Sequence, residues 1–174
     1  IGMVFLRLVN LIFQMSKTIR EIVKEKILIL DGAMGTEIQK YNLTDDDFRG
    51  ERFKDAPGQM KGNNDMLNIT RPEVISDIYR RYLEAGADLI TANTFSSQRI
   101  SQADYHLEEA AREMAYEGAR LARIQADKYS TEDKPRFVVG TVGPTNKTCS
   151  MSPDVSNPAA REITYDELFA DYCE

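Results

Sequence analysis

Three short stretches of the sequence combine residue types that could bind a small polar ligand. In each stretch, polar residues or glycine directly follow a run of apolar residues, as at the end of a buried strand. A carboxylate in such a place could bind an ammonium group, and backbone amides beside glycine could hold an anion. The residues are Asp31 and Gly32 after "ILIL", Asn93, Thr94 and Phe95 after "DLITA", and the segment 141–146 after "FVVG".

Each of the three stretches also suits a simple turn, because glycine, threonine, asparagine and aspartate are common turn residues. Asp31 has a second interpretation of this kind, in which its carboxylate caps the backbone amides that follow it. In parallel α/β proteins, however, ligands bind at the carboxyl ends of the strands, and in (β/α)8 barrels this face carries the active site. Three polar strand ends therefore favour a shared ligand site.

The apolar runs alternate with segments of helical pattern. An uninterrupted run such as "ILIL" is typical of a strand that is buried on both faces. Between the first two runs lies a long polar stretch, 37–65, which we expect to form an extended loop with, at most, a helical turn. The alternation predicts an α/β fold with parallel strands.

Two helices are marked clearly. The first is predicted to begin at a capping box formed by Thr70 and Glu73, with Pro72 in its first turn, and to stop at Gly86. The second is predicted over about 103–128, with one small apolar face. The apolar positions are Val74, Ile75, Ile78, Tyr82 and Leu83 in the first helix, and Leu107, Ala111, Met114, Gly118 and Leu121 in the second.

Shorter helices are predicted near both ends of the chain. Thr18 with Glu21 and Thr164 with Glu167 have the spacing of capping boxes, and the first of these helices should run to about Lys26. The acidic run at 45–47 follows a threonine, which is more typical of a helix start or a solvated loop than of a metal site.

The composition excludes several classes of function. With 174 residues, 42% hydrophobic and 29% charged, the chain is long enough for one domain and typical of a soluble globular protein. Its formal net charge is −6, and no basic stretch carries interleaved aromatic residues. We therefore expect neither nucleic acid nor an anionic membrane as a partner.

Two cysteines, Cys149 and Cys173, and one histidine, His106, leave little scope for thiol or metal chemistry. Two thiols do not make a disulfide framework, and the chain has too few such ligands for a zinc site of its own. We expect a reducing, cytoplasmic location. A nucleophilic Cys149 would need a histidine base, but His106 lies among charged residues and is expected to be solvated surface.

Residues 1–14, "IGMVFLRLVNLIFQ", are apolar but too short to span a bilayer. Their positive charge lies in the middle and no small-residue cleavage site follows, which argues against a signal sequence. Met15 then begins a polar segment typical of a cytoplasmic start. We expect 1–14 to be an extension outside the fold, with a signal sequence or an extra helix as alternatives, and 15–174 to form the domain.

Several of these segments together closely resemble the homocysteine S-methyltransferase family. They are "ILDGAMGTEIQ", "NDMLNITRPEVI", "YLEAGADLITANTF" and "GTVGPTNKT" followed by "SPDV", and the resemblance extends from about Ile19 to Glu174. "DGAMGT" alone would indicate only the wider family. "NITRPE" and "SPDV" favour the N-terminal homocysteine-binding domain of the cobalamin-dependent methionine synthases over the betaine-dependent relatives.

The resemblance implies a (β/α)8 TIM barrel in which a zinc ion, held by three cysteines near the later strands, binds homocysteine as its thiolate. The thiolate takes a methyl group from methylcobalamin and becomes methionine, and folate re-methylates the cobalamin in other domains. By resemblance, Asp31 lies where the family contacts the homocysteine amino group. Gly32 and the turn of Asn93, Thr94 and Phe95 would surround the polar end of the substrate.

The sequence departs from the family in its zinc ligands. The family's cysteines lie in an "N-C" motif and a later "G-G-C-C" motif, which neither Cys149 nor Cys173 matches. A family carboxylate on a later strand is also missing. We therefore expect the first half of a barrel, with zinc and cobalamin belonging to the full-length protein and neither bound by this fragment alone.

Such a half-barrel would have open strand edges. The isolated chain is expected to be a poor catalyst, or to dimerise through those edges. Its partners would be homocysteine, the remaining half of the barrel and the folate and cobalamin domains. Two alternatives stay open: a non-catalytic half-barrel that binds an amino acid or assembles with a partner, and an unrelated α/β barrel that uses "GTVGPT" to bind phosphate.

Overall fold

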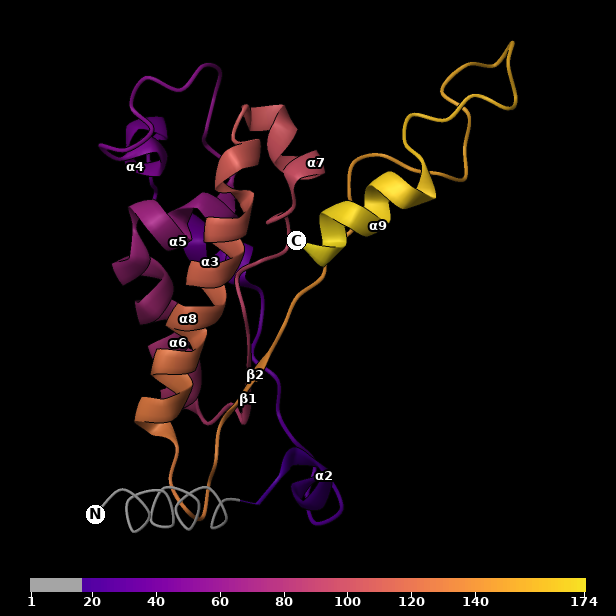
Figure 1. The fold of residues 1–174 in the computed structure, drawn as a ribbon. Coiled ribbons are helices and arrows are strands. Elements are labelled where there is room, and N and C mark those ends of the chain that lie inside the picture. The colour runs from indigo at the N-terminus through magenta and orange to yellow at the C-terminus, as the bar shows by residue number, and fades with distance from the viewer. Residues whose placement is uncertain (1–16) are drawn as a thin grey trace, which may run out of the picture.

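Three parallel segments lie beside a layer of helices in the computed structural model, which describes residues 17–174 (Figure 1). Strand β1, Leu89–Thr91, pairs in parallel with β2, Phe137–Val139. The segment 27–31 joins the other edge of β1 through a single parallel bridge between Leu30 and Leu89. The predicted α/β fold with parallel strands is confirmed, and the predicted extension at 1–14 lies outside the described residues.

The first predicted strand is only partly formed. Apart from its one bridge, the segment 27–30 has no regular pairing, and Ile27, Ile29 and Leu30 are 91%, 60% and 52% exposed. The prediction of a strand buried on both faces is therefore wrong for this segment. The physical reason is that the described chain supplies a helical layer for one side of the sheet and nothing that covers these side chains.

That layer consists of α6, Pro72–Ala85, and α8, Ala111–Tyr129, which pack against each other and against the strands. Gly86 ends α6 in the left-handed conformation at φ 109°, as predicted. The predicted apolar stripe of α6 is buried except at Tyr82, which is half-buried. Tyr79, one turn earlier in the helix, is fully buried instead.

The predicted capping box at Thr70 is wrong. Arg71 is the residue before α6, and its neighbour Thr70 belongs to the preceding short helix α5, Leu67–Thr70. The Thr70 hydroxyl donates to the Met66 carbonyl at 3.2 Å, one turn back. A threonine inside a helix commonly bonds backward in this way, and is then not available to cap the next helix.

The second predicted helix is shorter than expected. It begins at Ala111, and the preceding residues form α7, Arg99–Gln102, and two 3-10 turns, η2, Ala103–Tyr105, and η3, Glu108–Ala110. His106 separates the two turns with a positive φ of 56°, which a continuous helix does not allow. The small apolar face of the helix is buried as predicted, and His106 is exposed as predicted.

The remaining helices are short. Capping boxes start α2, Ile19–Ile22, and α9, Tyr165–Cys173, as predicted, but α2 ends at Ile22, before its predicted end at about Lys26. Thr44 and Asp47 form a further box at α4, Asp45–Arg49, so the acidic run is a helix start. With α3, Met34–Gln39, and the 3-10 turn η1, Asn64–Met66, the polar stretch therefore carries more helix than expected.

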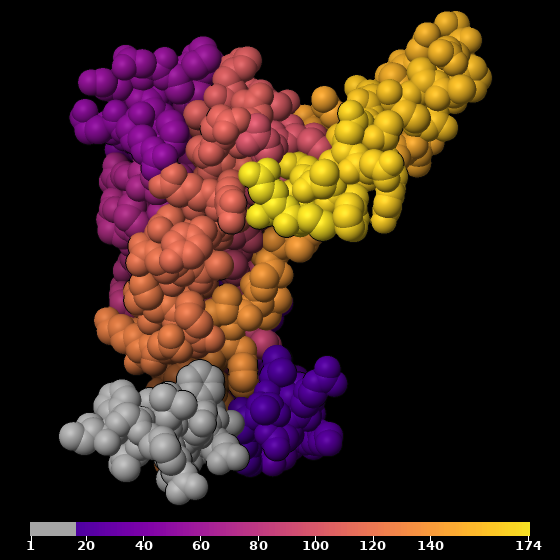
Figure 2. All heavy atoms as spheres, viewed as in Figure 1, coloured from indigo at the N-terminus to yellow at the C-terminus, as the bar shows by residue number. Residues whose placement is uncertain are grey.

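After β2, residues 140–164 project from the body of the molecule as an arm, and α9 brings the chain back to the body (Figure 2). The arm is held to the body by Asp171, whose carboxylate accepts hydrogen bonds from the backbone N–H groups of Arg99 and Ile100 at 2.9 and 3.1 Å. Of the helices in residues 17–174, none has the length and apolar character needed to cross a membrane.

Candidate functional site

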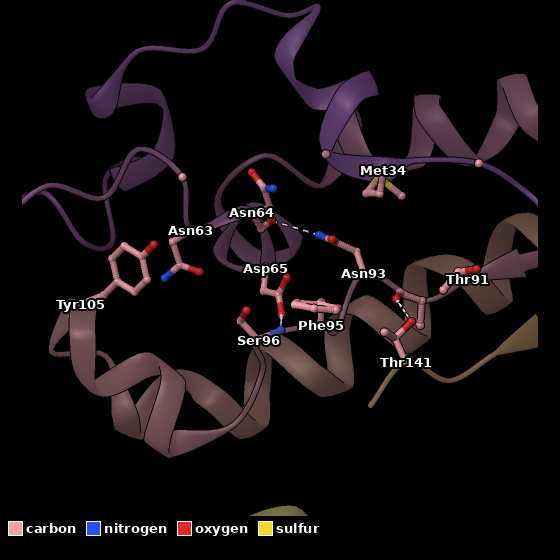
Figure 3. A pocket seen from close by; sticks show the side chains of 14 residues that line it. Met34, Asn63, Asn64, Asp65, Thr91, Asn93, Phe95, Ser96, Tyr105 and Thr141 are labelled. Atoms are coloured by element: carbon pink, nitrogen blue, oxygen red, sulfur yellow. Dashed lines mark hydrogen bonds between the residues drawn. The ribbon is translucent and has the colours of Figure 1, made fainter. Parts of the chain in front are cut away.

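A cavity of about 320 Å³ lies at the carboxyl ends of the three parallel segments (Figure 3). Its wall is built from the turns that follow segment 27–31, β1 and β2, together with the loop that leads into η1. The lining residues are Gly32, Met34, Gly35, Gly62, Asn63, Asn64, Asp65, Thr91, Ala92, Asn93, Phe95, Ser96, Tyr105 and Thr141.

Three of the five predicted site residues line this cavity, namely Gly32, Asn93 and Phe95. Asp31 and Thr94 do not line the cavity, but each is next in sequence to a residue that does. The turns after the parallel segments thus meet at one edge of the sheet, and the roles of the five residues toward a ligand remain predictions.

Asp31 is held in the wall by the neighbouring strand. Its Oδ2 accepts a hydrogen bond from the backbone N–H of Thr91 at 2.9 Å, and its Oδ1 accepts one from the Thr91 hydroxyl at 2.7 Å. Burial raises the pKa of Asp31 above its usual range, and the two bonds from Thr91 oppose that rise. The alternative interpretation, in which the Asp31 carboxylate caps the amides that follow it, is not what the structure shows, because both oxygens accept from Thr91.

Gly32 follows Asp31 at a point of close approach. A Cβ on this residue would lie 2.9 Å from the hydroxyl of Tyr82 on α6. A larger residue at this position would therefore require the Tyr82 ring to move.

Asn93 belongs to a buried amide cluster behind the cavity. Its side-chain amide donates to the carbonyl of Asn64 at 2.9 Å and to the side chain of Asn68 at 3.0 Å. Asn68 in turn donates to the Asn93 carbonyl at 2.7 Å, and the Tyr79 hydroxyl accepts from the Asn93 N–H at 2.8 Å. These bonds fix the turn after β1 to η1, α5 and α6 at the same time.

Thr94 and Phe95 have different places in that turn. The Thr94 hydroxyl donates to the Thr141 carbonyl at 2.9 Å, which ties the end of β1 to the end of β2. Phe95 lines the cavity and is 54% exposed. Helix α8 comes so close here that a Cβ on Gly118 would lie 2.8 Å from the Thr94 methyl group.

Asp65 is a cavity residue that reasoning from the sequence missed. It is 3% exposed, and its Oδ2 accepts hydrogen bonds from the Ser96 N–H at 2.6 Å and the Ser97 hydroxyl at 2.8 Å. Burial raises the pKa of Asp65 to about 6. The signal that could have identified it is an acidic residue set directly before the mainly apolar segment "MLNI".

The far end of the cavity is closed by Tyr105 and Asn63. Asn63 and Gln102 exchange two side-chain hydrogen bonds at 2.7 and 3.2 Å, and Gln102 also donates to the Ser96 carbonyl at 2.9 Å. Both amides are buried, so the bonds hold the loop before η1 against α7.

The residues of the cavity do not fit a zinc ion. Among residues 17–174, no group of three or more histidine, cysteine, aspartate or glutamate side chains is arranged to hold a metal. Cys149 is free and half-buried in the arm, and Cys173 is free and exposed at the end of α9. Neither cysteine lines the cavity.

The chain is similar to known proteins over most of its length. A family model described as homocysteine S-methyltransferase matches residues 28–174. The metallated form of the homocysteine methyltransferase MmuM from Escherichia coli is 23% identical, with a TM-score of 0.55 over 72% of this chain and 41% of that one. The oxidised form is 25% identical, with a TM-score of 0.56 over 72% and 40%. The chain thus spans about two fifths of the length of these structures.

Proposed function

Because the chain belongs to the homocysteine S-methyltransferase family, we propose that its cavity binds homocysteine for transfer of a methyl group to the sulfur. The observation that carries the proposal is the position of the cavity. It lies where three parallel segments end, which is the place where α/β proteins bind their ligands.

The predicted site residues would hold the amino-acid end of the substrate. Asp31 supplies negative charge on the side of the α-ammonium group, and Thr91 keeps that carboxylate in place. Gly32, Asn93, Thr94 and Phe95 would surround the polar end, with Phe95 as the exposed apolar wall. The work of these residues is to bind and orient the substrate.

We further propose that the acceptor reaction is that of the cobalamin-dependent branch, in which homocysteine becomes methionine. The support is the sequence resemblance at "NITRPE" and "SPDV". In that branch a bound zinc ion would supply the thiolate by lowering the pKa of the substrate thiol, and none of residues 17–174 is assigned to hold it. Since residues 17–174 hold no group of ligands for zinc, we assign zinc and cobalamin to other parts of a full-length cytoplasmic protein.

From the resemblance to the family, we also assign residues 15–174 to the N-terminal part of a (β/α)8 barrel. The three segments lie in chain order, and β2 pairs on one edge only within the described chain. The rest of the barrel would cover the exposed side chains of Ile27, Leu30 and Val142. The chain alone should be a poor catalyst of methyl transfer.

A binding or assembly module without catalysis is the second candidate. The observation that favours it is the same exposed apolar surface, since large exposed apolar groups mark interaction sites. Light scattering across a concentration series shows whether the isolated chain is a monomer or a dimer. A dimer would support association through the open edges, and a monomer at all concentrations would contradict an assembly module.

Calorimetric titration of the reduced chain with L-homocysteine tests the binding proposal. Phe95→Ala should weaken binding by about tenfold, because an apolar wall of the cavity is lost. The control is Tyr116→Ala, another exposed aromatic residue, on α8 and outside the cavity lining. An unmodified chain that binds no homocysteine, or equal losses in both variants, would contradict homocysteine binding in this cavity.

A further inference from the structure

Asp65 presents one carboxylate oxygen to the cavity without a hydrogen-bond partner. Both of its protein bonds, from Ser96 and Ser97, go to Oδ2. Its Oδ1 accepts no hydrogen bond from any residue in 17–174, although the side chain is 97% buried and lines the cavity. Figure 3 shows the carboxyl group between η1 and the turn that contains Ser96.

The surroundings of Asp65 contain no cation that would neutralise it. None of the ion pairs in the described chain includes Asp65. The titratable side chains near it are the hydroxyls of Tyr79 on α6 and Tyr105 on η2. Burial is the main cause that raises the pKa of both, and the negative charge of Asp65 adds to the rise. A buried carboxylate without a cationic partner is costly, and such groups are normally paired or ligand-bound.

Asp31, the other carboxylate of the region, is placed differently. Each of its oxygens already accepts a hydrogen bond from Thr91, and its side chain is not part of the cavity lining. Of the two, only Asp65 offers the cavity an oxygen that has no hydrogen bond.

We propose that Asp65 is the specificity-determining residue that makes this cavity select ligands with a primary ammonium group. The free Oδ1 would accept a charge-assisted hydrogen bond from the ammonium group while Oδ2 keeps its bonds to Ser96 and Ser97. The inference rests on the proposed function, since the α-ammonium group of homocysteine is the cation that would meet Asp65 there. It adds a second carboxylate, from η1, to the one expected at Asp31.

Asp65 also positions the turn of Ser96 and Ser97, so the experiment must separate ligand selection from a structural role. Three probes serve this purpose: L-homocysteine, 4-mercaptobutanoate, which lacks only the amino group, and L-norvaline, which has a methyl group in place of the thiol. Affinities are measured by calorimetry for the unmodified chain, for Asp65→Asn and for Ser97→Ala.

In Asp65→Asn, binding of homocysteine and norvaline should weaken by about tenfold or more, and binding of 4-mercaptobutanoate by less than about threefold. Ser97→Ala removes a bond to the same carboxylate but keeps its charge, so the preference for ammonium ligands should persist. Equal losses for all three probes in Asp65→Asn would show a structural role alone and overturn the inference.

A measurement on the unmodified chain covers the case in which Asp65→Asn does not fold. The preference for homocysteine over 4-mercaptobutanoate should be large at pH 8 and smaller at pH 5.5, where most of Asp65 is protonated and the carboxylates of both ligands stay largely ionised. A preference that does not change with pH would overturn the inference.

The outcomes for this inference and for the proposed function are distinct. If norvaline binds as tightly as homocysteine and both lose affinity in Asp65→Asn, the ammonium selection is supported and a thiol substrate is contradicted. If homocysteine binds best and Asp65→Asn weakens all probes alike, homocysteine binding stands and the selection by Asp65 fails. If the unmodified chain binds neither ammonium ligand, both proposals fail.

Discussion

Asp31 and Thr91 are joined by two hydrogen bonds, one from the Thr91 backbone N–H at 2.9 Å and one from its hydroxyl at 2.7 Å. The first residue ends the segment 27–31 and the second ends β1. Since only one bridge pairs these segments, the side chain of Asp31 supplies a substantial part of the connection between them.

Replacing Thr91 by valine should therefore destabilise the fold. Thr91→Val removes the hydroxyl donor, leaves the shape nearly unchanged and should lower the free energy of unfolding by about 1–2 kcal/mol. Urea denaturation at pH 7 measures this. Thr36→Val on α3 is the control, because Thr36 is exposed, and a loss of the same size there would contradict the role of the bond to Asp31.

Gly118→Ala should destabilise the chain although it replaces glycine inside a helix. In an open helix this change stabilises by up to about 1 kcal/mol, whereas overpacking a core costs about 1–3 kcal/mol. The added Cβ would lie 2.7 Å from Asn68 Nδ2 and 2.9 Å from the Asn93 carbonyl oxygen, so the overpacking should dominate. Gly140→Ala, with nothing within 4 Å, is the control for the unfolding measurement. A more stable Gly118→Ala variant would show that α8 does not press on the turn after β1.

Asn68→Ala should cost about 2–4 kcal/mol of unfolding free energy, because it leaves two buried carbonyl groups without their donors. Asn68 is 1% exposed and donates to the carbonyls of Asn93 and Met114. Asn146→Ala removes an exposed amide bonded to Asp104 and should cost less than about 0.5 kcal/mol. Similar costs in the two variants would contradict the importance of the buried amide cluster.

The stability of the chain should depend on pH through Asp65. Its pKa is about 6 in the folded chain and its usual value is 3.8, so the folded state holds this proton more tightly. Stability from this group is present below about pH 4 and is lost as pH rises to about 6, by roughly 3 kcal/mol. The unfolding free energy of Asp65→Asn relative to the unmodified chain should therefore rise over that window.

Urea denaturation at pH 4, 5, 6 and 7 measures the difference between the two chains. Asp154→Asn is the control, because hydrogen bonds from Ser156 lower the pKa of that exposed carboxylate and any slope should be opposite in sign. A difference between Asp65→Asn and the unmodified chain that is constant over this range would contradict the burial of the Asp65 charge.

Reasoning from the sequence was successful where the signal is local. The capping boxes at Thr18 and Thr164 form as predicted, and Gly86 ends α6. It failed at Thr70, where two helices compete for one threonine, and at His106, whose positive φ interrupts the predicted helix. Both failures depend on how consecutive elements meet, which the spacing of capping and apolar residues does not encode.

By itself, the sequence determined the α/β alternation, the family to which the chain belongs and the polar strand ends that meet at the cavity. The spacing of apolar residues and the presence of a helix cap depend on neighbours within about one helical turn, so both can be predicted without knowledge of the tertiary structure. Only the tertiary structure decided that Asp65 is buried in the cavity wall with a free oxygen, and that Ile27 and Leu30 lack cover. Burial and solvation are set by segments far away in the chain, and they decide which carboxylate meets a ligand.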